Sequence, residues 1–291
     1  MRARDLTDLI LLAALWAGSF LFMRYAAPAF GPVPLIWLRV AVAALCLAPL
    51  LILRGQQGVL RQHATGIALM GVFSSALPFV LIAWAMLSIT AGLASILNAT
   101  VPIFTALIGA LWLGERLGAW RTSGLAVGFG GVLLLAADKA DFKPGGSGWA
   151  IAAMLLATLS YGFAANLARR RLTGVPALVN AAGSQIVSAI VLLPFAVWFW
   201  PPTTPGWMAW SAAVVLGVGC TALAFLLFFR LIANVGASRA VTVTFLIPLF
   251  GVLWGSLFLG ETLNAGMLVG GSVVVLGTAL ATGVLHLPVR A

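Results

Sequence analysis

Apolar segments recur along nearly the whole chain, separated by short breaks rich in glycine, proline or charge, such as GPVP at 31–34 and PPTTPG at 201–206. A helix needs about 20 mostly apolar residues to cross the hydrocarbon layer of a membrane. The pattern therefore predicts an all-α membrane protein with ten transmembrane helices. They are expected at roughly 6–26, 33–53, 65–87, 90–113, 117–137, 148–168, 176–199, 208–231, 236–259 and 264–285. The first of these reads as a span and not as a signal peptide, because it lacks a clean cleavage pattern.

One stretch of the chain occurs twice. Residues 89–136 align with residues 235–282 at a constant offset of 146, with 16 identities in 48 positions and no gap. Five spans per half is an odd number, so the second half must enter the membrane from the opposite side. The sequence predicts two inverted five-helix repeats, residues 1–142 and 143–291, around a central cavity, an arrangement suited to alternating access.

Composition and charge agree with a membrane protein. The chain is 63% hydrophobic and 8% charged, and a soluble domain is usually about a quarter charged. Its net charge of +10 does not indicate a nucleic-acid partner, since the basic residues lie between apolar segments and not along one stripe. With the N-terminus inside, 12 of the 16 basic residues fall on one side and three on the other. The positive-inside rule then places both termini in the cytoplasm.

The fourth and ninth predicted spans each carry a face of small and polar residues with a proline near the middle. These faces are Ala91, Ser95, Asn98, Pro102, Thr105 and Gly109, and Ala237, Val241, Thr244, Pro248, Gly251 and Gly255. One interpretation is a packing seam with a kink, because small residues let helices approach closely. The other is that Asn98 and Thr244 border a transport path, and their repeat-related positions favour it. Either way, a carbonyl freed by the proline needs a neighbour or water.

Arg39 lies inside the second span, about 9 Å below its outer end at 1.5 Å per residue. Two interpretations stand side by side: the side chain reaches back to the membrane surface, or it faces a cavity and meets a substrate carboxylate or backbone carbonyls. The corresponding region of the second half offers Ser184 and Gln185.

Further candidates for cavity lining come from mid-span aromatic and hydroxyl residues. Trp16 and Tyr161 correspond if the offset slips by one, and such a pair could stack on an apolar substrate. Ordinary helix packing is the alternative for each. The pairs Ser74-Ser75 and Cys220-Thr221 are also equivalent, with Phe79 and Phe225 one turn beyond.

The two glutamates of the repeat, Glu115 and Glu261, are read as helix ends. Each follows a glycine suited to ending a helix, and each carboxylate can cap the N-terminus of the next helix. No Asp, Glu or His lies in the middle of a span. The sequence therefore argues against proton coupling through a buried acid and against an intramembrane enzyme, and no cofactor or metal is expected.

Several motifs together resemble the EamA group of the drug/metabolite transporter superfamily, over essentially the whole chain. They are AGLASILNATVPIFTALIGALWLGERL with the following GLAVGFGGVLLL, the opening pair LLAALWAGSFLFMR and PLIWLRVAVAALCLAPL, and the second copy VGASRAVTVTFLIPLFGVLWGSLFLGETL. The resemblance implies ten helices and export of small metabolites, often amino acids including aromatic ones, across a bacterial inner membrane. It implies a small-molecule substrate and the lipid bilayer as partners of a monomer or weak homo-oligomer. A multidrug exporter is the first alternative, and a channel or membrane scaffold is the second.

Overall fold

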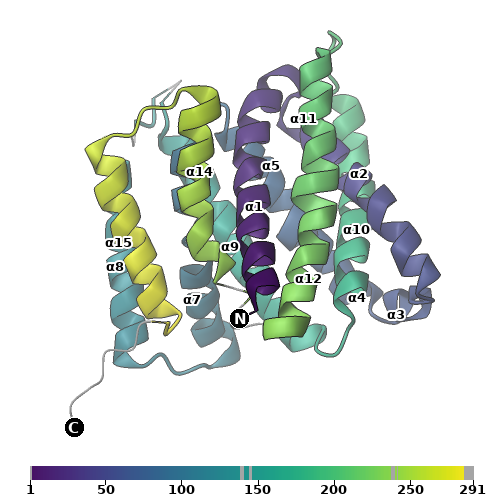
Figure 1. Ribbon diagram of the computed structural model, residues 1–291, viewed down its shortest axis with the longest axis horizontal. Helices are drawn as coiled ribbons and strands as arrows, with labels where there is room; N and C mark the ends of the chain where they lie inside the picture. The colour runs from purple at the N-terminus through teal and green to yellow at the C-terminus, as the bar shows by residue number, and fades with distance from the viewer. Residues whose placement is uncertain (1, 138–140, 144–145, 237–239, 241, 285–291) are drawn as a thin grey trace.

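The structure is a computed structural model that describes residues 2–137, 141–143, 146–236, 240 and 242–284. Within these residues all regular structure is helical, and most helices run side by side along one direction (Figure 1). Ala237 and Val241, expected on the face of the ninth span, lie outside the described residues.

The helices follow one another along the chain as one long series. Their bounds are α1 (Ala3–Phe30), α2 (Pro32–Leu53), α3 (Gln57–Gln62), α4 (Ala64–Gly71), η1 (Val72–Ala76), α5 (Leu77–Ala85), α6 (Ala91–Asn98), α7 (Val101–Leu113), α8 (Ala119–Ala137), α9 (Gly148–Arg171), α10 (Ala177–Trp198), α11 (Trp207–Gly217), η2 (Val218–Leu223), α12 (Ala224–Val235), α14 (Val243–Leu259) and α15 (Ala265–Ala281). The two η segments are single turns of π-helix that continue the α-helices on either side.

Eight continuous helical stretches of the described chain are long and apolar enough to cross a membrane, which confirms the predicted class. They correspond in order to the first eight predicted spans. The last two predicted spans correspond to α14 and α15, which are apolar but have only 17 residues each. A helix of 17 residues is about 26 Å long at 1.5 Å per residue, close to the lower limit for a span.

The fourth predicted span is broken and not simply kinked. α6 ends at Asn98 and α7 begins at Val101, so Pro102 lies in the first turn of α7, where its missing N–H leaves no gap in the ladder. The hydroxyl of Thr278 on α15 donates to the carbonyl of Ala99 over 2.8 Å and so gives this carbonyl in the break a partner. In the second half, Pro248 stays inside α14.

The π-helical segments were not anticipated, and they occupy repeat-related positions. η1 starts at Val72 and η2 starts at Val218, 146 residues later. In η1, Pro78 follows within two residues, and its ring excludes the carbonyl four residues before it from normal helical bonding. In η2 the equivalent residue is Ala224, and the hydroxyl of Thr221 donates to the carbonyl of Leu216, five residues earlier, over 2.7 Å. Such wide turns are frequent at functional sites.

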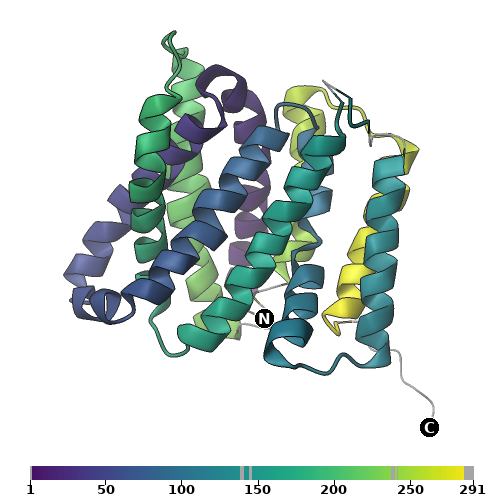
Figure 2. The ribbon, with the colours of Figure 1, turned by 180° about the vertical axis from the view of Figure 1, so that it is seen from behind.

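The pair α8 and α15 forms one edge of the molecule, as both ribbon views show (Figures 1 and 2). Glycines let the two backbones nearly touch: a Cβ at Gly131 would lie 2.7 Å from the backbone nitrogen of Val274 and 3.0 Å from the carbonyl oxygen of Gly270. A Cβ at Gly124 would lie 2.8 Å from the carbonyl oxygen of Gly277. The two contacts are related by the repeat. The offset of 146 carries Gly124 onto Gly270 and Gly131 onto Gly277, so the pair Gly124–Gly277 corresponds to the pair Gly270–Gly131.

Candidate functional site

A cavity of about 380 Å³ lies between helices of the two halves. Its walls come from α1, α2, α4, η1, α5, α6 and α7 on one side and from α9, α10, η2, α12 and α14 on the other. Of the residues named from the sequence as candidates for cavity lining, the structure places ten in its wall: Trp16, Arg39, Ser74, Phe79, Asn98, Tyr161, Cys220, Thr221, Phe225 and Thr244. Residues from opposite ends of the chain therefore meet at one site.

Arg39 is the one charged residue in the wall of this cavity, and its side chain is turned inward. The residue is only 4% exposed, so the interpretation that it reaches back to the membrane surface is wrong. Its Nε donates to Thr221 Oγ1 at 2.9 Å, and one terminal nitrogen donates to Ser19 Oγ at 3.4 Å. The guanidinium carbon lies 3.8 Å from the centre of the Phe79 ring. These neutral groups and the π face of Phe79 stabilise the cation but do not neutralise it.

Aromatic rings form much of the rest of the wall. The rings of Trp16 and Phe228 lie 5.1 Å apart, and those of Phe79 and Tyr161 lie 6.3 Å apart. Trp16 and Tyr161 thus both line the cavity, as expected, but they do not pack on each other. Trp16 packs on Phe228 of the second half, and Tyr161 packs on Phe79 of the first half. Such rings bury large apolar areas at well-defined positions.

Several polar groups of the wall have no internal hydrogen bond in the described part of the chain. They are the side-chain amide of Asn98, the hydroxyl of Tyr161 and the indole N–H of Trp16. Ser184, named from the sequence in the region that corresponds to Arg39, also lines the wall, whereas sequence reasoning missed two further polar residues, Ser19 and Asn180. Asn180 and Ser184 lie one helical turn apart on α10, so a search for small polar residues at a spacing of four would have found Asn180 as well.

Four predicted residues lie outside this wall. Ser75 and Gln185 bond to each other, with Gln185 Nε2 donating to Ser75 Oγ at 3.0 Å, and both side chains are fully buried. Pro102 and Pro248 are not among the lining residues of the cavity.

Two hydrogen bonds between the halves have repeat-related positions. Arg39 of the first half donates to Thr221 in η2, and Gln185 of the second half donates to Ser75 in η1. The offset of 146 carries Arg39 onto Gln185 and Ser75 onto Thr221. Each half therefore contributes one long side chain that donates a hydrogen bond, from a spanning helix, and one hydroxyl that accepts it, from a π-helical turn.

The two glutamates lie away from the cavity, and one of them caps an unexpected helix. Glu261 accepts the backbone N–H groups of Ala91 and Gly92, at 2.7 and 3.0 Å, at the N-terminus of α6 in the other half. The expectation that it caps the following helix is wrong, since Asn264 caps α15 by accepting from the Met267 N–H at 2.7 Å. Glu115 forms an ion pair with Arg169.

The preceding glycines, Gly114 and Gly260, end α7 and α14 in the left-handed conformation, as expected.

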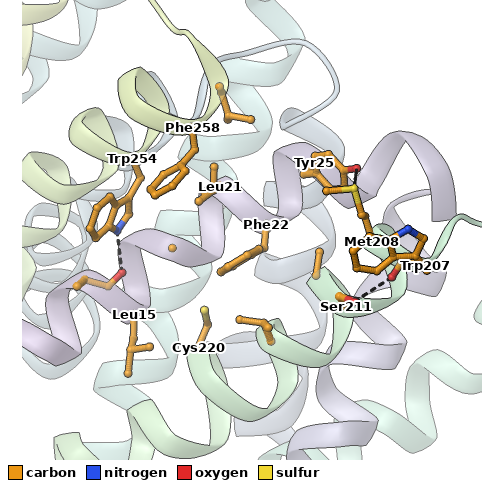
Figure 3. A pocket seen from close by; sticks show the side chains of 15 residues that line it. Leu15, Leu21, Phe22, Tyr25, Trp207, Met208, Ser211, Cys220, Trp254 and Phe258 are labelled. Atoms are coloured by element: carbon orange, nitrogen blue, oxygen red, sulfur yellow. Dashed lines mark hydrogen bonds between the residues drawn. The ribbon is translucent and has the colours of Figure 1, made fainter.

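A second hollow, of about 600 Å³, is an apolar groove between α1, α11 and α14 (Figure 3). Two of its polar side chains donate to backbone carbonyls of lining residues: Trp254 Nε1 donates to the carbonyl of Ala14 at 3.1 Å, and Ser211 Oγ donates to that of Trp207 at 3.0 Å. Cys220 lines both this groove and the central cavity. Although the groove is larger, the central cavity is the candidate site because it alone combines a charge with open polar groups.

These features define a multi-pass membrane protein with a largely apolar cavity at its centre that contains one charged side chain. The model of the EamA-like transporter family matches residues 8–137 and again 148–283, and the chain belongs to that family.

Named relatives agree with this membership. The chain is 29% identical to a probable terminal-alkyne amino-acid exporter of Streptantibioticus cattleyicolor, over 94% of this chain and 91% of the relative. It is 24% identical to the uncharacterized inner membrane transporter YedA of Escherichia coli K12, over 97% of this chain and 93% of the relative. One crystal structure matches with a TM-score of 0.68 and 21% identity, over 98% of this chain and 99% of that one, which supports the same fold. The protein is a membrane transporter of this family.

Proposed function

We propose that the protein exports small, partly apolar metabolites, with amino acids as the leading class, by alternating access through the central cavity. The observation that carries this proposal is the cavity between the halves, flanked by two cross-half hydrogen bonds at repeat-related positions. Both bonds are formed in this structure. If the two similar halves exchange roles, contacts that close one side of the cavity in one state have repeat-related counterparts that can close the other side in the other state. That exchange is the physical basis of alternating access in repeat-built carriers.

The proposed architecture has ten transmembrane helices in two inverted five-helix repeats, residues 1–142 and 143–291, with α14 and α15 as the ninth and tenth spans. Three observations support it: the π-helical turns that begin 146 residues apart, the exchanged glycine contacts of α8 and α15, and the match of one family model to each half. The excess of basic residues on one side supports cytoplasmic termini in an inner membrane. A monomer is sufficient for this mechanism, and a weak homo-oligomer is compatible with it.

The wall of the cavity favours a solute with one polar end and one apolar end. Arg39 and the amide of Asn98 can meet a carboxylate or another polar group, while Trp16 and Phe79 can meet an apolar or aromatic body. One relative is named as an exporter of an amino acid, which agrees with such a solute.

A multidrug or lipophilic-compound exporter is the second candidate. The apolar groove supports it, because the groove could take up a lipophilic solute and shares the lining residue Cys220 with the cavity.

Flux in proteoliposomes tests the proposal. Purified protein is reconstituted and loaded with a panel of unlabelled amino acids, and counterflow of a labelled one is followed. Saturable counterflow with competition is expected. Flux that never saturates would indicate a channel, and no flux of any solute would indicate a scaffold. The chain offers no mid-span acid, so a pH gradient alone should not concentrate substrate. Uphill accumulation driven by protons would contradict that part.

A further inference from the structure

The central cavity contains a fixed positive charge without a matching negative charge. Arg39 is 4% exposed and makes no ion pair in the described part of the chain; its partners there are the hydroxyls of Thr221 and Ser19, the sulfur of Met23 and the Phe79 ring. A buried guanidinium is costly in a membrane unless a counter-ion or water meets it. An unpaired one that lines a cavity is therefore a site for an anion.

The acids that the structure describes do not supply that counter-ion, because each of them is engaged elsewhere. Asp8 pairs with Arg230, Asp5 accepts from Asn234, Glu115 pairs with Arg169, Glu261 caps α6, and Asp141 accepts from the N–H of Lys143. None of the residues that line the cavity is an acid. An ammonium group in this cavity would meet only hydroxyls, amides and aromatic faces, and it would be repelled by Arg39.

We infer that the cavity binds organic monoanions, with the carboxylate of the solute on Arg39 and an apolar body against Trp16, Phe79 and Phe228. This inference rests on the proposed transport function and sharpens its substrate class. An amino acid brings the same carboxylate but also an ammonium for which the cavity has no counter-charge. A carboxylate without the amino group therefore binds more tightly than the matching amino acid.

The charge has a consequence for the energy of transport. Arg39 stays with the protein, so each transported monoanion carries one negative charge across the membrane. A potential of 100 mV, negative inside, drives one such charge outward by about 2.3 kcal/mol, or a ~50-fold concentration ratio. Export would thus run on the membrane potential, which fits a chain without a mid-span acid for proton coupling.

Three probes with a common phenylethyl skeleton test the binding site: 3-phenylpropanoate carries the carboxylate alone, L-phenylalanine carries both charges, and phenethylamine carries the ammonium alone. Calorimetric titration of the purified protein should give affinities in that order, with at least tenfold between the first and the last. The R39Q variant should lose binding of 3-phenylpropanoate, whereas R39K should retain part of it because the charge remains. R24Q is the matched control, since Arg24 donates to the carbonyl of Met86 outside the cavity. Equal affinities for the three probes, or unchanged binding by a folded R39Q, would overturn the inference.

Efflux from proteoliposomes with an imposed potassium diffusion potential tests the energetics. An inside-negative potential should accelerate efflux of 3-phenylpropanoate above that from protein-free vesicles and leave efflux of L-phenylalanine unchanged. Potential-independent transport of phenylalanine without transport of 3-phenylpropanoate overturns this inference and leaves the proposed function standing. Tight binding of 3-phenylpropanoate without flux of any probe overturns the proposed function and leaves the anion site standing.

Discussion

The side-chain amide of Gln185 donates to the hydroxyl of Ser75 over 3.0 Å, and both residues are fully buried between the halves of the chain. The oxygen of this amide, Oε1, is buried without a partner in the described residues. In the described residues the Ser75 hydroxyl is the one hydrogen-bond partner of the Gln185 side chain. Loss of this bond would leave the whole buried amide without a partner.

Ser75→Ala should therefore destabilise the protein. It leaves the buried amide of Gln185 without a partner, which costs about 1–3 kcal/mol. Thermal unfolding in detergent measures the loss. The double variant with Gln185→Leu removes both partners and should recover part of the stability, whereas additive losses from the two substitutions would show that the bond contributes little.

Gly131→Ala should separate α8 from α15. The added Cβ would lie 2.7 Å from a backbone nitrogen of α15, so the helices must move apart, at a cost of about 1–3 kcal/mol by analogy with overpacked cores. Gly130→Ala is the matched control, since a Cβ at the neighbouring glycine meets nothing within 4 Å. Unfolding temperatures of the two variants decide the matter; a Gly131→Ala protein as stable as the control would contradict the tight contact.

Asn98→Ala should reduce transport without reducing stability, because the Asn98 amide lines the cavity and makes no hydrogen bond in the described residues. Asn166→Ala should do the reverse. The Asn166 amide donates to the carbonyls of Thr105 and Gly162, each at 2.9 Å, and their loss should cost about 1–3 kcal/mol. Flux and unfolding are measured on both variants. Normal flux by a well-folded Asn98→Ala protein would remove Asn98 from the transport path.

Single cysteines should report the orientation of the chain. In a background with Cys46→Ala and Cys220→Ala, Thr203→Cys in the loop before α11 should react with an impermeant maleimide added to whole cells. Thr173→Cys in the loop before α10 should react only after the cells are opened. Both threonines are exposed. Labelling of Thr173→Cys from outside would reverse the proposed topology.

The order and approximate limits of the helices could be predicted from the sequence because hydropathy over 20 residues is a strong signal. The break between Asn98 and Val101 could not, since both sides of it are equally apolar and the carbonyl of Ala99 finds its partner, Thr278, 179 residues later. The π-helical turns at η1 and η2 could not be predicted for a related reason. Hydropathy carries no information on which backbone carbonyl a given N–H group bonds to.

Ten of the residues that line the cavity were named from the sequence as candidates for cavity lining, but their contacts were not predicted. The depth of Arg39 in its span allowed two directions for its side chain, and only the position of Thr221 in the other half decides between them. Glu261 was recognised as a cap, yet its helix lies in the other half of the sequence, which periodicity along one segment cannot reveal.

The inward-turned guanidinium of Arg39 also bears on what the protein must keep out. A path that opens to water many times each second risks leaking protons and potassium ions, and a fixed cation in the path is the device by which water-conducting pores reject them. In the proposed mechanism, the same side chain that would bind a carboxylate would also make the open path a poor conductor of cations. A cell can then keep many copies of this transporter in its membrane without running down the ion gradients on which its other carriers depend.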